Sequence, residues 1–133
     1  MKRVMAFGTF DIFHEGHKSY LTQAKASGEY LIVVTARDET VLRVKGEWTK
    51  NSEDERLEAV KKSGLADEVI LGDLEDKYSV INQYRPDVIA LGYDQEADLI
   101  ELRKKLKKFK LQSRIVRLKS YAPERYKSSK LRK

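Results

Sequence analysis

Apolar residues in this chain form short continuous runs that alternate with longer stretches of helical spacing. The runs are rich in Val, Ile and Leu and are apolar on both faces, as strands inside a parallel sheet are. The segment YLIVVTA at 30–36 is the clearest of them. Five strands are predicted, over Lys2–Phe7, Tyr30–Ala36, Glu68–Leu71, Asp87–Leu91 and Ser113–Leu118.

Between the runs, apolar residues recur every three or four positions, which predicts amphipathic helices. Ser52 and Glu55 have the spacing of a capping box at a helix start. Gly28 is predicted to cap the end of the helix that precedes it, and Gly64 follows the helix that ends near Ser63. The predicted helices cover Glu15–Ser27, Ser52–Ser63, Lys77–Tyr84 and Ala97–Phe109, with a short one from near Ser128, and 37–46 is expected to be irregular.

This alternation of strands and helices predicts an α/β fold with a parallel five-stranded sheet and helices on both faces. The length of the chain favours a single domain over residues 1–133. In such sheets ligands bind beyond the carboxyl ends of the strands, where the strand order reverses. Polar segments follow the first, second, fourth and fifth strands, so we expect them to surround one site: 8–11, 37–40, 92–95 and 120–121.

Composition narrows the function classes. The chain has no cysteine, which excludes disulfides, thiolate metal sites and thiol nucleophiles. No apolar run approaches the length of a membrane span, and the N-terminus has no signal-peptide pattern. A cytoplasmic location and no membrane partner are therefore expected.

The net charge of +6 is unevenly distributed. Residues 102–133 hold fourteen Lys and Arg but one acid, Glu124, so the remainder is net acidic. This basic quarter could bind nucleic acid or could combine a solvated helix face with residues that meet nucleotide phosphates. The second interpretation is favoured, because the run coincides with an amphipathic helix and has no RNA-binding motif.

The most informative segment is GTFDIFHEGH at 8–17, between the first predicted strand and the first helix. It contains both histidines of the chain, His14 and His17. Backbone N–H groups at a helix start lack partners, and the helix dipole favours an anion there. If the helix begins near His14, both imidazoles fall on one face and can touch the same phosphate.

These ten residues resemble the signature of the nucleotidylyltransferase superfamily, whose hallmark is His-x-Gly-His near the N-terminus. The resemblance implies a Rossmann-like fold and attack of a phosphate monoester on the α-phosphorus of a nucleoside triphosphate. It implies that His14 and His17 contact the triphosphate. In the same nucleotide-binding segment, Thr9 and Phe10 would offer amides, Gly8 and Gly16 would allow close approach, and Glu15 lies between the histidines.

For Asp11 two roles stay open: it could orient a histidine or help to hold Mg²⁺, or it could simply cap the turn. A magnesium ion bound mainly by phosphates and water needs only one or two carboxylates.

The resemblance also indicates residues for the acceptor phosphate. Family members carry a lysine in the loop after the second strand and an arginine on the next helix, and Lys45 and Arg56 occupy comparable places. Lys45 could swing over the acceptor from a glycine-hinged loop, or it could be a solvated lysine. Arg37 could face the same phosphate, or it could pair with Asp38 or Glu39.

Two later segments complete the implied site. Gly92, Asp94 and Gln95 resemble the stretch that lines the base and ribose, although Asp94 could also cap the next helix. The segment YKSSK at 126–130 resembles the late motif in which hydroxyls grip the β- and γ-phosphates. Lys127, Ser128 and Ser129 would act there with Tyr121 beside the base, unless this segment is a frayed basic tail.

Within the superfamily the chain is most similar to archaeal FAD synthetases. It shares the stretches ARDETV at 36–41 and ALGYDQ at 90–95, and 126–130 departs from the Arg-Thr-x-Gly-Ile-Ser-Thr of cytidylyltransferases. This resemblance implies transfer of AMP from ATP, with Mg²⁺, to FMN, giving FAD and pyrophosphate, in an enzyme that could be a homodimer. The alternatives are a glycerol-3-phosphate cytidylyltransferase, a sugar-phosphate adenylyltransferase and a non-catalytic nucleotide- or nucleic-acid-binding module. The intact histidine pair argues against the last.

Overall fold

Five parallel strands form one sheet in the part of the chain that the computed structural model describes, residues 1–92 and 99–119. The strand order is β3-β2-β1-β4-β5. The bounds are β1 (Arg3–Gly8), β2 (Tyr30–Thr35), β3 (Glu68–Leu71), β4 (Val88–Leu91) and β5 (Arg114–Arg117). The predicted parallel sheet is confirmed. The helix predicted from near Ser128 lies outside the described residues.

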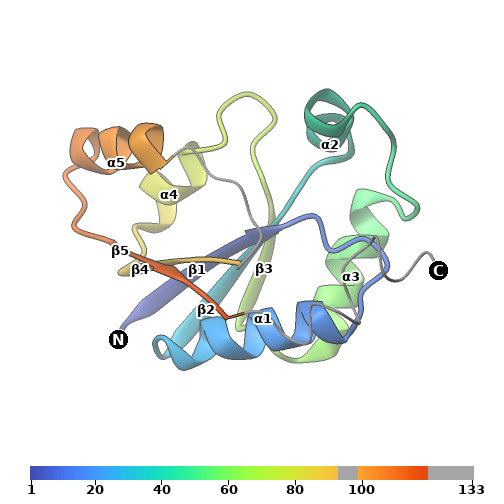
Figure 1. Cartoon of the computed structure of the whole chain (residues 1–133), viewed down its shortest axis with the longest axis horizontal. Helices are drawn as coiled ribbons and strands as arrows, with labels where there is room; N and C mark the ends of the chain where they lie inside the picture. The colour runs from blue at the N-terminus through green and yellow to red at the C-terminus, as the bar shows by residue number, and fades with distance from the viewer. Residues whose placement is uncertain (93–98, 120–133) are drawn as a thin grey trace.

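Helices lie on both faces of the sheet, as predicted (Figure 1). Their bounds are α1 (Glu15–Ala26), α2 (Asp38–Lys45), α3 (Glu53–Ser63), α4 (Ser79–Tyr84) and α5 (Leu99–Lys108). One face is covered by α1 and α3, and the other by α4 and α5. Over 1–92 and 99–119, no helix combines the length and the apolar character needed to cross a membrane.

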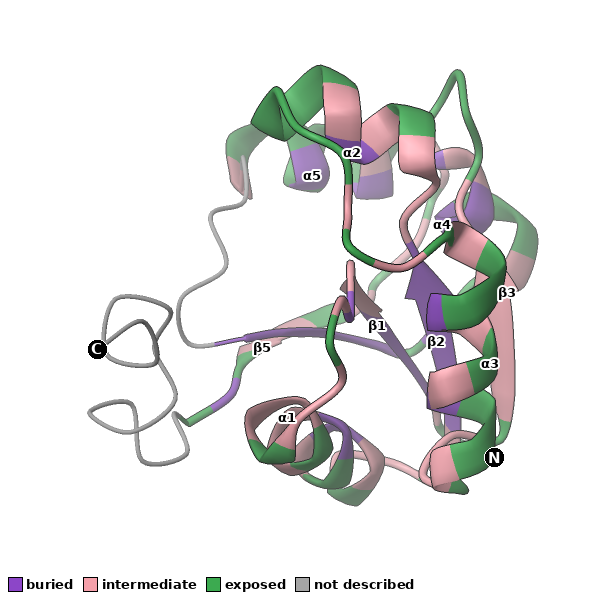
Figure 2. Ribbon diagram, turned by 90° about the vertical axis from the view of Figure 1, so that its right-hand side faces the viewer, coloured by how far each residue is buried: buried purple, intermediate pink, exposed green. Residues whose placement is uncertain are grey.

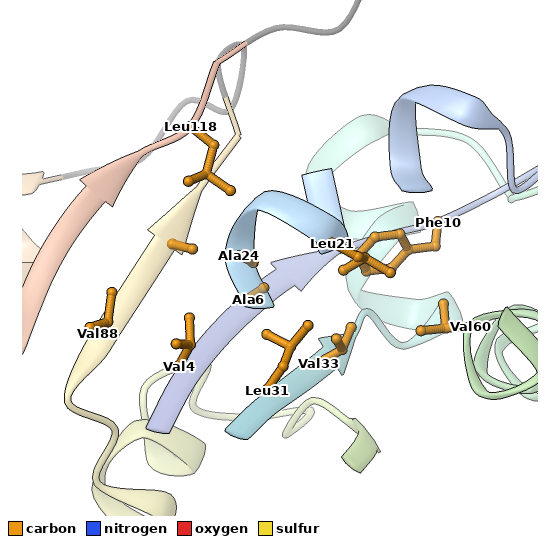
Figure 3. Close-up of a cluster of buried hydrophobic side chains, with 11 residues drawn as sticks. Val4, Ala6, Phe10, Leu21, Ala24, Leu31, Val33, Val60, Val88 and Leu118 are labelled. Carbon is orange, nitrogen blue, oxygen red and sulfur yellow. The ribbon is translucent and has the colours of Figure 1, made fainter. Parts of the chain in front are cut away.

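Alternating residues of the central strands build two hydrophobic cores. Val4 and Ala6 point to the α1 and α3 side, where they join Leu21 (Figure 3). Met5 points to the opposite side and packs in the cluster that contains Leu102. Both faces of β1 are therefore buried, and each large aliphatic side chain buried there contributes about 1.5–3 kcal/mol. Figure 2 shows these strands as the buried centre of the molecule.

One predicted loop is a helix. Residues 37–46 were expected to be irregular, but Asp38–Lys45 forms α2. Its acids lie in the first turn and its bases in the last, which suits the helix dipole. Gly46, in the left-handed conformation with φ of 79°, ends the helix. Because Val41 is its only buried residue, the apolar periodicity is weak, which is why the pattern did not reveal it.

The predicted start of α3 is confirmed, whereas the predicted glycine cap of α1 is not. Ser52 and Glu55 form the predicted capping box of α3, and Gly64 ends that helix with φ of 71°. At α1 the prediction was wrong, since Ser27 is the C-cap and Gly28 has no positive φ. Gly28 is needed for space instead. A Cβ there would lie 2.6 Å from a Val4 methyl carbon.

The strand order reverses between β1 and β4, which defines the expected ligand-binding edge. The β1–β2 ladder continues to Gly8 and Thr35, and the β4–β5 ladder continues to Leu91 and Arg117. The β1–β4 ladder stops earlier, at Ala6 and Ala90. The two central strands therefore part at their carboxyl ends.

Candidate active site

The turn after β1 is strained and is held by aromatic packing. Phe10 and Ile12 have φ of 56° and 50°, a left-handed conformation that costs roughly 1–2 kcal/mol for a residue with a side chain. The Phe10 ring is buried and meets the rings of Phe13, His17 and Tyr20. A Cβ on residue 8 would lie 2.8 Å from that ring. Glycine at position 8 therefore makes room for Phe10 itself.

The two histidines start α1 together. His14 is the N-cap, and its Nδ1 accepts the Gly16 N–H at 3.0 Å. His17, three residues on, accepts the His14 N–H on its own Nδ1 at 3.2 Å. This is a capping box built from two imidazoles, and their rings stack with centroids 3.9 Å apart. The prediction that both lie on one face of the helix start is confirmed.

These hydrogen bonds fix the chemistry of the imidazoles. Because Nδ1 accepts in both rings, each neutral ring carries its proton on Nε2. Burial lowers the pKa of both histidines. At His14 the neighbouring Glu15 carboxylate raises the pKa, but burial outweighs it. For His17, burial and then the neighbouring His14 lower the pKa to about 4. At neutral pH the pair therefore consists of uncharged hydrogen-bond donors.

Asp11 connects the turn to the segment before α3. Its carboxylate accepts the Lys50 N–H at 2.7 Å, the Asn51 N–H at 3.0 Å and the Asn51 side-chain amide at 3.2 Å. Burial opposes its ionisation, but these donors and Arg56 outweigh burial and lower the pKa of Asp11. Both oxygens are thus engaged by protein donors, which is the turn-capping role that the sequence left open for Asp11 beside the metal contact. Among the described residues there is no group of three or more His, Cys, Asp or Glu that could hold a metal ion.

Arg56 is buried, with 1% of its surface exposed, and its donors point into the protein. Its Nη2 pairs with Asp38 at 2.7 Å, its Nη1 donates to the Thr9 carbonyl at 2.8 Å, and its Nε donates to the Asn51 carbonyl at 3.2 Å. Burial raises and Arg56 lowers the pKa of Asp38, with a net lowering. This geometry does not match the expected phosphate contact. Arg56 instead ties α3 to the turn after β1 and to α2.

The other two predicted acceptor contacts sit at opposite ends of α2. Arg37 donates from Nε to the Gly72 carbonyl at 2.9 Å and pairs with Glu53 at 3.2 Å. Its ion pair is thus neither of the two anticipated ones. Lys45 is the exposed last residue of the helix rather than part of a hinged loop. The eight residues of α2 separate these two positions by about 12 Å.

Some of the remaining predicted residues lie at the carboxyl edge of the sheet, and the others lie outside the described residues. Gly92 directly follows β4, and its carbonyl accepts a hydrogen bond from Arg117 at 2.9 Å. Glu15 is exposed at the start of α1 and pairs with Lys18 at 3.2 Å. The segments after β1, β2 and β4 thus meet at one edge of the sheet, as predicted. Outside the described residues lie Asp94, Gln95, Tyr121, Lys127, Ser128 and Ser129.

Sequence reasoning missed Tyr20 and Asn51. Tyr20 lies one helical turn beyond His17, and its hydroxyl reaches the main chain of both β1 and β4. Tyr20 follows His17 by three residues, as His17 follows His14, and this spacing could have indicated that all three lie on one face of the helix. Asn51 is bound to Asp11 across 40 positions of sequence, and no local pattern marks it.

Comparison with known proteins agrees with this geometry. Residues 5–133 match the model of the cytidylyltransferase-like family, so the chain belongs to that family. More particularly, it is 42% identical to a protein named FAD synthase from Thermoplasma acidophilum, over 100% of this chain and 93% of that protein. A second FAD synthase, from Aciduliprofundum boonei, is 43% identical over 91% of this chain and 80% of its own length. The predicted resemblance to archaeal FAD synthetases is confirmed.

Solved structures confirm the fold. A Thermoplasma volcanium protein described as a lipopolysaccharide core biosynthesis protein has a TM-score of 0.85 at 41% identity. The match covers 91% of this chain and 98% of that one. A pantoate-beta-alanine ligase from Francisella tularensis has a TM-score of 0.60 at 13% identity, over 88% of this chain and 58% of that one. The latter likeness concerns the fold alone.

Proposed function

We propose that this protein is an FMN adenylyltransferase, which converts ATP and FMN to FAD and pyrophosphate. The observation that carries the proposal is the stacked His14 and His17 pair at the start of α1, in which Nδ1 of each ring accepts a main-chain N–H and Nε2 carries the proton. Identity of about two residues in five with proteins named FAD synthase, over most or all of the chain, supports FMN as the acceptor.

The reaction needs positioning and electrostatics more than acid–base chemistry. An oxygen of the FMN phosphate donates an electron pair to the α-phosphorus of ATP. The bond from that phosphorus to the bridging oxygen breaks, and its electron pair leaves with pyrophosphate. The nucleophile is already an anion, so no general base is required. Mg²⁺ enters as part of the MgATP substrate, and no step is assigned to a protein-bound metal.

In this proposal, neutral histidines stabilise the transferred group by hydrogen bonding. Nε2 of His17 would donate to an oxygen of the α-phosphate, where charge develops, and His14 would hold a neighbouring oxygen. Donors held in place before the reaction do not have to reorganise during it, and one such donor is typically worth about 10²–10³ in rate. The strained turn and the Phe10 packing keep both rings in place.

The other predicted residues keep narrower roles in the proposal. Lys45, on the exposed end of α2, would reach the FMN phosphate, whereas Arg37 and Arg56 position the segments around it. Asp11 fixes the turn against residues 50 and 51. The nucleotide would be bound by Gly8, Thr9, Phe10, Glu15, Gly16, Gly92, Asp94, Gln95, Tyr121, Lys127, Ser128 and Ser129. A cytoplasmic location and a homodimer are further parts of the proposal.

The test is a matrix of donors and acceptors with Mg²⁺ present. The protein is incubated with ATP or CTP and with FMN, glycerol 3-phosphate or a sugar phosphate, and pyrophosphate and FAD are measured. We expect both products with ATP and FMN only. Turnover of CTP with glycerol 3-phosphate would replace the proposal with a cytidylyltransferase. Absence of turnover with every acceptor, together with salt-sensitive RNA binding, would support a non-catalytic module.

A further inference from the structure

The gap between β1 and β4 leaves main-chain groups that the sheet does not pair. Phe7 and Gly8 continue β1 beyond the last β1–β4 ladder pair, and Leu91 continues β4. Buried N–H and C=O groups at such a place need other partners. What fills the gap therefore determines how far apart the two strands end.

The Tyr20 hydroxyl fills it. The hydroxyl accepts the Phe7 N–H at 3.2 Å and donates to the Ala90 carbonyl at 2.9 Å, with the Phe7 carbonyl also at 3.2 Å. A phenol has one proton, and of these two carbonyls the Ala90 oxygen is the nearer acceptor. Burial raises the pKa of Tyr20, so the phenol stays protonated. One side-chain oxygen thus bridges the two strands where their ladder has ended.

The same helix carries the histidines, so this bridge is tied to the candidate site. His14, His17 and Tyr20 follow one another at intervals of three residues along α1. The Tyr20 ring is stacked on Phe10, with centroids 6.2 Å apart and planes 25° apart, and Phe10 in turn contacts His17. The position of Tyr20 therefore relates the imidazoles of α1 to the end of β4, which Gly92 follows.

We propose that Tyr20 is a positioning residue for the nucleotide: its hydroxyl sets the separation of β1 and β4 at the carboxyl edge, and with it the distance between the histidine pair and Gly92. The inference rests on the proposed function, in which these two places hold the triphosphate and the nucleoside of one ATP. Without the hydroxyl, the Phe7 N–H and the Ala90 carbonyl lose the contact that joins β1 to β4 here. This loss changes the separation of the two strands and moves the two parts of the ATP site relative to one another.

The test compares Tyr20→Phe with Tyr30→Phe. Each substitution removes one hydroxyl and keeps the ring, but Tyr30 donates to the Glu68 carboxylate at 3.0 Å, from the amino end of β2. For both variants we would measure kcat, the KM values for ATP and FMN, the Kd of a non-hydrolysable ATP analogue and the melting temperature. Tyr20→Phe is expected to weaken ATP binding about tenfold, since a buried hydrogen-bonding partner is lost from two main-chain groups. Its KM for FMN should stay within about twofold, and Tyr30→Phe should leave both substrates unaffected.

The outcomes separate the inference from the proposed function. A lower melting temperature with an unchanged Kd for the ATP analogue would make Tyr20 purely structural and overturn the inference. An equal rise in both KM values would also overturn it, because positioning of the nucleotide alone does not predict it. If the parent protein binds the ATP analogue but does not adenylylate FMN, the proposed function fails. The Kd comparison still tests Tyr20 in that case.

Discussion

The segments that follow β1 and β2 both carry ionisable residues to the same edge of the sheet, but they use them in opposite ways. After β1, Nδ1 of His14 and Nδ1 of His17 each accept a main-chain N–H at the start of α1, and each ring carries its proton on Nε2. Around the start of α2, the guanidinium groups of Arg37 and Arg56 donate their hydrogen bonds to carbonyls and carboxylates of the protein. The first segment is arranged as a set of hydrogen-bond donors. In the second, the charged side chains form a brace, which here means that they tie α2 and α3 to neighbouring segments of the protein.

This difference shows why residue type alone does not assign a role at such a site. A buried guanidinium with an ion-pair partner has little to offer a ligand, because turning it towards a ligand would leave the partner carboxylate without its counter-charge. A neutral imidazole fixed at one nitrogen has its other nitrogen defined as a donor.

Arg56→Met should destabilise the protein by about 3–5 kcal/mol, because the substitution leaves Asp38 half of a broken ion pair. Urea unfolding followed by circular dichroism measures the change. Arg37→Met is the matched control, since its pair with Glu53 is partly exposed and is worth about 1 kcal/mol or less. A stable Arg56 variant with a greatly raised KM for FMN would return Arg56 to the acceptor phosphate and erase the contrast.

His17→Ala should lower kcat by about 10²–10³ with the fold retained, because the proposed donor to the reacting phosphate is lost. Steady-state FAD formation gives the rate, and circular dichroism checks the helix content. Lys18→Ala is the control: the exposed Lys18 ammonium pairs with exposed Glu15, and turnover should not change. A near-normal rate for His17→Ala would remove this residue from the mechanism.

The histidine pair should also appear in the pH dependence of stability. The pKa of His17 is about 4 in the folded, ligand-free protein and 6.5 in the unfolded chain. The unfolded state therefore binds the proton first as the pH falls. The contribution of neutral His17 is complete above pH 6.5 and is lost progressively towards pH 4, by up to about 3 kcal/mol. Two-dimensional NMR of the imidazole ring should place its midpoint well below 6, and a midpoint near 6.5 would contradict its burial.

Asp11→Asn should have the smallest effect, about 1–2 kcal/mol of stability, because one carboxylate oxygen becomes an amide facing N–H donors. The sole tryptophan, Trp48, lies two residues before Lys50 and is 64% exposed. Its emission should shift when the segment is released, whereas Asp54→Asn, on the exposed side of α3, should leave it unchanged. An unchanged emission for Asp11→Asn would separate the turn from this segment.

Short sequence patterns predicted those features that depend on residues close together in the chain. The central strands were recognisable from their continuous apolar runs, and the capping box of α3 from the spacing of three between its two residues. The histidine pair was placed on one helix face for the same reason. The strand order was not readable, since nothing in β4 says that it pairs with β1.

The brace around α2 could not be predicted from the sequence. Arg56 meets Asp38 across 18 positions, and Arg37 meets Glu53 across 16, so each pairing exists only after the sheet has formed. The helix α2 itself had a readable signal in its charges and in Gly46. Its single buried residue, Val41, kept that signal below the level of an apolar repeat.

The capping box formed by His14 and His17 has an evolutionary consequence. Histidine is not among the residues that best cap a helix, which are Ser, Thr, Asp and Asn. A lineage released from catalysis could therefore gain stability by exchanging His14 for one of these, as stability and activity often trade against each other. The start of the helix alone therefore does not account for His14, since Ser, Thr, Asp or Asn would cap it better.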